Sequence, residues 1–162
     1  DMAGFVQWPD ARLKAKADLR ATVDDELKAI GERLLAAAKA ERAYGLAAAH
    51  IGEIAPVVVV SGEGTPPVLL FNPQVTAVSE TTSAGDEGSV SAPGVRVDVD
   101  RPDWADVRFM DTTGATIEQR FSGFLGRVVQ HEIDQMNGHF FLDRVSRLKR
   151  DMALKKARKL AG

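Results

Sequence analysis

The sequence predicts a domain of the α+β class, in which antiparallel strands occupy the middle of the chain. β-Branched runs separated by turn residues fill that middle part, and apolar residues recur at helical spacing on both sides of it. The strands come in succession and do not alternate with helices, as they would in a parallel sheet. The chain has 162 residues, of which 44% are hydrophobic, so we expect one domain spanning residues 1–162.

The first predicted helix begins after a capping residue. Thr22 is the expected N-cap, because three acidic residues follow at 24–26, where the helix dipole favours them. Gly45 is the expected end of this helix. The residues that recur at helical spacing between these points are Leu27, Ile30, Leu34 and Ala38.

The strands and the closing helices follow in order along the chain. We expect strands at 55–61, 68–71, 75–78, 95–99, 104–110 and 115–121. A turn at 111–114 predicts a hairpin between the last two. Helices at about 123–136 and 146–160 complete the chain, and the first of them is expected to be the central one.

Composition excludes several classes of protein. The net charge of -2 gives no general bias toward nucleic acid or anionic membranes. The chain has no cysteine, which excludes disulfides, thiolate metal ligands and a cysteine nucleophile. Neither a membrane-spanning apolar run nor a signal-peptide pattern is visible. We therefore expect a cytoplasmic protein that contacts no membrane and no specific DNA.

Glu132 is the most unusual residue of the predicted central helix, because it falls among apolar residues on the helical wheel. One interpretation is a general base whose pKa is raised by burial, and the other is a core carboxylate bonded to a nearby amide. His131 and Gln135 flank the same arc and point to one side. The apolar residues of the arc are Phe124, Leu125, Val128, Val129, Ile133 and Met136.

Three stretches of the chain resemble the three motifs that mark the peptide deformylases. They read YGLAAAHIG at 44–52, DEGSVSAPG at 86–94, which we expect to be a loop, and QHEIDQMNG at 130–138. Their order and spacing are those of the family, and FVQWPDARL near the N-terminus resembles its opening segment. The resemblance implies the family's fold, with antiparallel strands packed around the helix that carries His-Glu-x-x-Gln.

The resemblance also implies an activity, removal of the formyl group from N-formyl-methionyl peptides. In the family a zinc or iron ion is held at the positions of Ser89, His131 and Gln135, where Cys, His and His are usual. Glu132 falls at the position that handles the proton. His50 replaces the glutamine that, with a backbone amide at the position of Val90, binds the oxyanion. Positions near the substrate are Gly45, Glu87, Arg96, Phe124, Arg127 and Val128.

Two of the three implied metal ligands are therefore changed. A hydroxyl and an amide oxygen are weaker donors to zinc or iron than a thiolate and an imidazole. We expect zinc or iron to bind at reduced affinity, and the protein as purified to hold neither. His50 offers two alternatives: it replaces the hydrogen bonds of glutamine, or it forms a relocated metal site with His131.

Four functional hypotheses follow. The first is a deformylase with weak or altered activity, and the second is a non-catalytic module that binds peptide N-termini. The third is a metal-free amide hydrolase, in which Ser89 acts with His50 or His131 and with Glu87 or Glu132. The fourth is a ribosome-binding module, because the last 20 residues hold eight bases against two acids; a solvated, packed helix is the competing interpretation.

Arg127 is polar where the family is apolar. It precedes His131 by one helical turn, so its guanidinium is expected to repel a divalent cation and to attract an anionic group into the pocket. The competing interpretation is that Arg127 reaches solvent or pairs with a surface acid.

Overall fold

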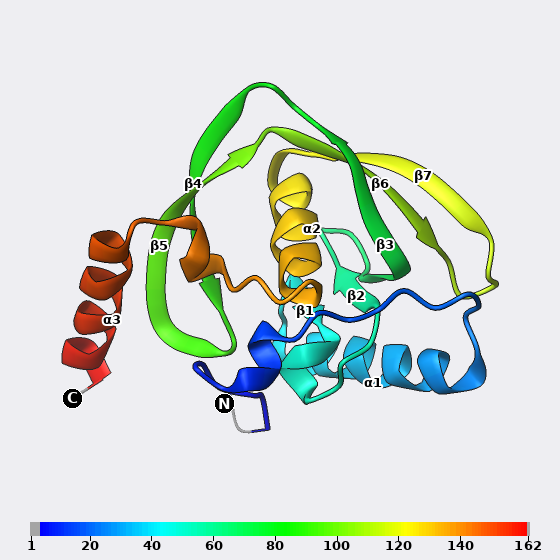
Figure 1. Ribbon diagram of the computed structural model, residues 1–162, viewed down its shortest axis with the longest axis horizontal. Coiled ribbons are helices and arrows are strands. Elements are labelled where there is room, and N and C mark those ends of the chain that lie inside the picture. The colour runs from blue at the N-terminus through cyan, green and yellow to red at the C-terminus, as the bar shows by residue number, and fades with distance from the viewer. Residues whose placement is uncertain (1–3, 162) are drawn as a thin grey trace.

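Helix α2 (Gly123–Met136) lies at the centre of the molecule, and two antiparallel sheets curve around it (Figure 1). The structure is a computed structural model in which residues 4–161 are described. Within that range, no helix is both long enough and apolar enough to cross a membrane. The α+β class and the antiparallel arrangement predicted from the sequence are confirmed.

The larger sheet has five strands in the order β1-β2-β3-β6-β7. Their bounds are Gly45–Ala47, Val57–Val60, Val68–Val78, Trp104–Met110 and Thr116–Ser122. Strand β2 is buried along its whole length, which explains its run of four valines. Strands β6 and β7 form the predicted hairpin, in register from Trp104 opposite Ser122 to Met110 opposite Thr116.

The smaller sheet pairs β4 (Thr82–Ser89) with β5 (Ala92–Pro102). Alternate residues of β5 are buried, and Arg101 follows the three buried valines of that face. Helix α3 (Arg147–Ala161) packs on the outside of β5 through Ala153 and Ala157 (Figure 1). This sheet forms one wall beside α2 and carries the second of the three motifs.

Helix α1 (Asp25–Glu41) covers one face of the large sheet through Leu27, Ile30 and Leu34, near β2 and β3. Its ends differ from the prediction. Asp24, not Thr22, is the N-cap, because its carboxylate accepts a hydrogen bond from the amide of Leu27. The helix stops at Glu41, not near Gly45, because Arg42 adopts a left-handed conformation.

Two strand predictions also need correction. The segments predicted at 68–71 and 75–78 are one strand, β3, which continues through Asn72 and Pro73. Asn72 has a left-handed backbone, and its side chain exchanges two hydrogen bonds of 2.8 Å with the backbone of Arg20, so the chain is held at this irregular point without turning. The expected loop at 86–94 is the β4–β5 hairpin, and β4 was not predicted.

Candidate functional site

Helix α2 positions the third motif in the interior. His131, Glu132 and Gln135 are all buried on it, between the large sheet and the β4–β5 hairpin. Gln130 is buried too, and its amide donates to the carbonyl oxygens of Pro102 and Gly126. Because α2 is enclosed on most sides, every polar side chain on it needs a partner.

Glu87 is the centre of a buried ion-pair network. Its carboxylate accepts hydrogen bonds from Nε and Nη2 of Arg101 at 2.6 and 2.9 Å, and its Oε1 lies 2.8 Å from Nδ1 of His131. Burial alone would raise the pKa of Glu87, but the hydrogen bonds from His131 and Arg101 lower it to about 2. Glu87 is therefore a carboxylate that orients the ring of His131.

Arg127 joins the same network. Its Nη1 donates to Glu87 and to the carbonyl oxygen of Val99, both at 2.8 Å, and its Nη2 donates to the carbonyl oxygen of Ser83. The interpretation that Arg127 reaches solvent or pairs with a surface acid is therefore wrong. Its partners are a buried carboxylate and two strand carbonyls, so Arg127 ties α2 to the β4–β5 sheet.

The network extends from Arg101 to the far side of α2. Nη1 of Arg101 lies 2.9 Å from Asp134, and Arg144 binds the same carboxylate through two hydrogen bonds of 2.8 Å. Sequence reasoning did not identify Arg101, although it had a signal. Arg101 shares the period-two spacing of Val95, Val97 and Val99, which predicts an inward side chain.

His50 has a fixed tautomer when it is neutral. Its Nδ1 accepts a hydrogen bond of 2.9 Å from the amide of Ala47. The proton of the neutral ring must then lie on Nε2, which is buried without a hydrogen-bond partner in the described structure. Burial, with a contribution from His131, lowers the pKa of His50 to about 3. His50 is thus a neutral, unpartnered donor.

Glu132 lies beside His50. Its Oε1 is 3.9 Å from Nδ1 of His50 and has no hydrogen-bond partner among the described residues. Burial is the main cause that raises the pKa of Glu132 to about 7. The interpretation that Glu132 is a core carboxylate bonded to an amide gains no support from these contacts. A carboxyl group with this pKa can take up or release a proton near neutral pH.

The two substituted positions are held by backbone groups. Nε2 of Gln135 donates to the carbonyl oxygen of Leu13 at 2.7 Å, and its Oε1 has no partner in the described chain. The hydroxyl of Ser89 accepts a hydrogen bond of 3.1 Å from the amide of Ser91. Ser89 makes no hydrogen bond to either histidine or to either glutamate, so the described contacts do not assemble a Ser-His-acid arrangement.

These donors do not fit the zinc or iron ion that the family motifs imply. Among residues 4–161, no group of three or more His, Cys, Asp or Glu side chains is arranged to hold a metal ion. His50 does not replace a lost ligand while it accepts the amide of Ala47, because its Nε2 then carries the proton. Burial alone would lower the pKa of His131, but the carboxylates of Glu132 and Glu87 raise it. Its Nδ1 faces Glu87, so Nε2 is the atom that a neutral His131 could offer to a metal ion, and it is the one ligand type of the family motifs that this chain retains.

A groove opens next to these residues, with a volume of about 480 Å³. Phe124 stands at its mouth, 47% exposed, with its ring edge-on to Tyr44 at 4.8 Å between centroids. Arg96, which is exposed, pairs with Asp86 at the same rim. The predicted site residues that line the groove are Gly45, His50, Glu87, Ser89, Val90, Arg96, Phe124, Arg127, Val128, His131 and Glu132.

Gln135 is the exception, since it lies deeper than the groove and is not among its lining residues.

Position 45 requires a glycine. A Cβ atom there would come within 2.8 Å of Glu132 and 2.7 Å of Val128, so only glycine lets β1 approach α2 this closely. The three motifs therefore meet around one cavity, as their resemblance implies.

Comparison with known proteins supports this arrangement. The family model described as polypeptide deformylase matches residues 2–151. A peptide deformylase-like protein of Agrobacterium fabrum is 41% identical over 154 residues, which cover 94% of this chain and 93% of the relative. A peptide deformylase of a Picosynechococcus species is 35% identical, over 94% of this chain and 88% of its own length.

Solved structures give the same result. The peptide deformylase of Ehrlichia chaffeensis superimposes with a TM-score of 0.88 at 28% identity, covering 98% of this chain and 96% of that one. The Synechococcus elongatus enzyme, solved in complex with actinonin, gives 0.87 at 32% identity over 94% and 85% of the two chains. With its motifs gathered around one groove and its fold shared throughout, the chain belongs to the peptide deformylase family.

Proposed function

We propose that this protein binds the formylated N-terminus of a peptide in the groove beside α2, and that it removes the formyl group only weakly. The family, which is metal-dependent, and the groove of about 480 Å³ support the peptide as ligand. Apolar side chains, Phe124 and Val128, line the groove near Glu132, where a methionine side chain would pack.

The observation that most supports the proposal is the buried Nε2–H group of His50, which has no hydrogen-bond partner in the described structure. A buried N–H group without a partner costs free energy, so it favours a ligand that brings an acceptor. The carbonyl oxygen of a formyl group is such an acceptor, whereas a free amino terminus brings only donors. Since Nδ1 is held by Ala47, the donor at Nε2 is fixed before any ligand arrives.

Glu132 would supply the proton chemistry. With its pKa near 7, it exists in both protonation states at neutral pH and lies in the same cavity as His50. The weakness of the reaction follows from the positions of Ser89 and Gln135. A neutral hydroxyl and a neutral amide replace the implied strong ligands, so no strong Lewis acid is held against the formyl oxygen.

Calorimetric titration of three peptides tests the proposal. Formyl-Met-Ala-Ser should bind at least about tenfold more tightly than Met-Ala-Ser, a difference of about 1.4 kcal/mol. His50→Leu should remove that preference, and His50→Gln should keep most of it, because glutamine also offers a donor. Acetyl-Met-Ala-Ser also lacks the amino charge and also brings a carbonyl oxygen, so it differs from the formyl peptide only by a methyl group and tests whether the site is shaped for formyl.

Equal affinity for the formylated and free peptides would refute the binding proposal. Turnover of formyl-Met-Ala-Ser at the rate of an ordinary deformylase, by the protein as purified, would refute the weak-activity proposal. The two results are independent, because the first is an affinity and the second a rate.

A second candidate function rests on α3. We propose that this helix docks on the ribosome. Its inner side packs on β5, while Leu148 and Met152 are 70% and 63% exposed. On a helical wheel, Lys155, Lys156 and Lys159 lie close to these two residues, opposite Ala157. Basic side chains around exposed apolar ones suit a surface that presents both phosphate and protein.

Co-sedimentation with purified ribosomes tests this second proposal. The wild type should pellet with ribosomes at low salt and dissociate as salt is raised. Lys155→Glu with Lys156→Glu should abolish pelleting, while Lys28→Glu with Lys39→Glu on α1 is the control for the same charge reversal elsewhere. Pelleting that is unaffected by the α3 reversal would refute the assignment.

A further inference from the structure

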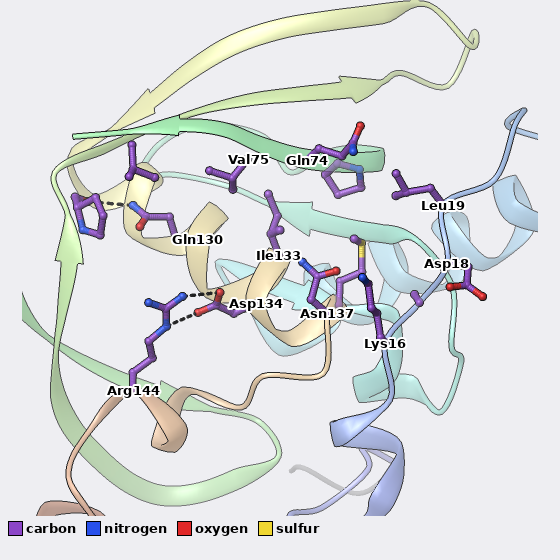
Figure 2. Close-up of a pocket in the computed structure, with 15 residues that line it drawn as sticks. Lys16, Asp18, Leu19, Gln74, Val75, Gln130, Ile133, Asp134, Asn137 and Arg144 are labelled. Carbon is purple, nitrogen blue, oxygen red and sulfur yellow. Dashed lines mark hydrogen bonds and ion pairs between the residues drawn. The ribbon is translucent and has the colours of Figure 1, made fainter. Parts of the chain in front are cut away.

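A second cavity lies on the side of α2 away from the groove, with a volume of about 610 Å³. Figure 2 shows it bounded by β3, by α2 with Ile133 and Asp134, and by the N-terminal segment that carries Lys16 and Leu19. Its apolar lining includes Val75, Ile133 and Leu19. Nothing in the proposed deformylase chemistry uses this cavity.

Strand β3 borders this cavity with an unpaired edge. Strand β2 pairs with one edge of β3, but only from Val68 to Phe71, and β6 pairs with the opposite edge from Phe71 to Val78. In the described chain no strand covers residues 74–78 on the edge that β2 would occupy if it were longer. Backbone N–H and C=O groups on such an edge form a template for one more strand.

The composition of this edge favours pairing. Residues 74–78 read QVTAV; they are uncharged and all exposed. The other long edge strand, β7, differs, because it carries Glu118 and Arg120, which form ion pairs with Arg108 and Asp106. Charged side chains on an edge discourage the addition of a strand, and β3 lacks them here.

The charges that line the cavity balance. Lys16 and Arg144 are the bases among its lining residues, and Asp18 and Asp134 are the acids. A preference for an acidic partner therefore depends on the donor that Arg144 leaves free.

Arg144 is the arginine of the ion-pair network that lines the cavity. It uses Nε and Nη2 on Asp134, and no hydrogen bond engages its Nη1 in residues 4–161. Figure 2 shows Arg144 across the cavity from β3. A ligand that lies along β3 and carries a carboxylate would therefore meet a free donor on the opposite wall.

We propose that the free edge of β3 binds an extended peptide segment that presents apolar side chains to the cavity and an acidic group to Arg144. The edge faces a cavity bounded by α2 and Arg144. Backbone pairing would supply affinity, and the cavity would supply the preference for side chains. The site is independent of the formyl-peptide groove, because it lies on the other side of α2.

Binding of the peptide acetyl-Val-Thr-Val-Glu-Val-amide, followed by calorimetry and by amide chemical shifts, tests the proposal. Shifts should concentrate on residues 74–78, and a version with lysine in place of glutamate should bind about tenfold more weakly. A version that is N-methylated at alternate residues should not bind, because it lacks the N–H groups of a paired strand.

Matched variants separate this site from the groove. Val75→Glu places an acid in the cavity and should weaken binding at least about tenfold, whereas Gln119→Glu on β7 should not change it. Gly45→Ala, in the groove, should not change it either. Equal binding of the N-methylated peptide, shifts confined to the groove, or no binding would overturn the proposal. Self-association that Val75→Glu abolishes would overturn it in favour of a second copy as the occupant.

Discussion

The guanidinium of Arg127 lies 2.8 Å from the carboxylate of Glu87, which is also bound by Arg101 and faces the ring of His131. A fixed positive charge therefore stands one helical turn before His131, where the family resemblance implies an apolar side chain. This places a cation beside the position where the motifs of relatives imply a metal ion, so the loss of ligands and the gain of Arg127 act in the same direction.

Restoring the lost ligands should restore metal binding only in part. Ser89→Cys with Gln135→His should increase affinity for Co²⁺, and adding Arg127→Leu should increase it by at least a further factor of about ten, because a repelling charge is removed. The thiolate-to-cobalt absorption band measures both. Arg120→Leu, which removes a surface arginine, is the control. Equal affinity of the double and triple variants would show that Arg127 does not oppose the metal.

Glu87 should be among the most stabilising polar residues. Glu87→Gln leaves the buried guanidinium of Arg101 without its main counter-ion, and breaking a buried pair costs about 3–5 kcal/mol. Urea unfolding measures the loss. Glu118→Gln, which breaks the exposed pair with Arg108, should cost less than about 1 kcal/mol. Similar losses for the two variants would contradict the role given to Glu87.

Glu87 should also make the free energy of unfolding depend on pH in the acid range. Because its pKa in the folded protein is about 2, below the ordinary value of 4.5, the stability that Glu87 contributes is complete above about pH 4.5. That contribution is lost as pH falls toward 2. The free energy of unfolding of the wild type should therefore decrease across this window more steeply than that of Glu87→Gln. Parallel curves would contradict the lowered pKa.

Gly45→Ala should close the groove without unfolding the protein. The added Cβ atom meets the side chains of Val128 and Glu132 at 2.7–2.8 Å, so one of them must move into the cavity. We expect affinity for formyl-Met-Ala-Ser to decrease at least about tenfold. Gly62→Ala is the matched control, because its Cβ atom meets nothing closer than 3.4 Å. Unchanged affinity in Gly45→Ala would place the peptide elsewhere.

Sequence patterns predicted the parts of the fold that have one dominant local signal. Helix α2 was predicted with its observed bounds, because its apolar arc continues from Phe124 to Met136. The β6–β7 hairpin was predicted from its turn. Strand β4 was missed because Gly85, Asp86 and Gly88 disfavour a strand, and only pairing with β5 stabilises it.

The site was less accessible to sequence reasoning than the fold. The motifs brought the predicted residues to one cavity, but which partners they bind depends on tertiary packing. Arg127 was predicted to act on the pocket by its charge, yet the sequence did not show that Glu87 would bind it. The tautomer of His50 depends on one amide, that of Ala47, which only the β1 backbone places.

We propose that the groove recognises a formyl group through His50 without a metal ion. The most direct test is calorimetric titration of formyl-Met-Ala-Ser into protein that has been treated with a chelator and checked for metal by elemental analysis. The affinity of the chelated protein should equal that of the untreated protein and should fall in His50→Leu. Loss of binding on chelation, with recovery when Zn²⁺ or Fe²⁺ is added, would contradict it.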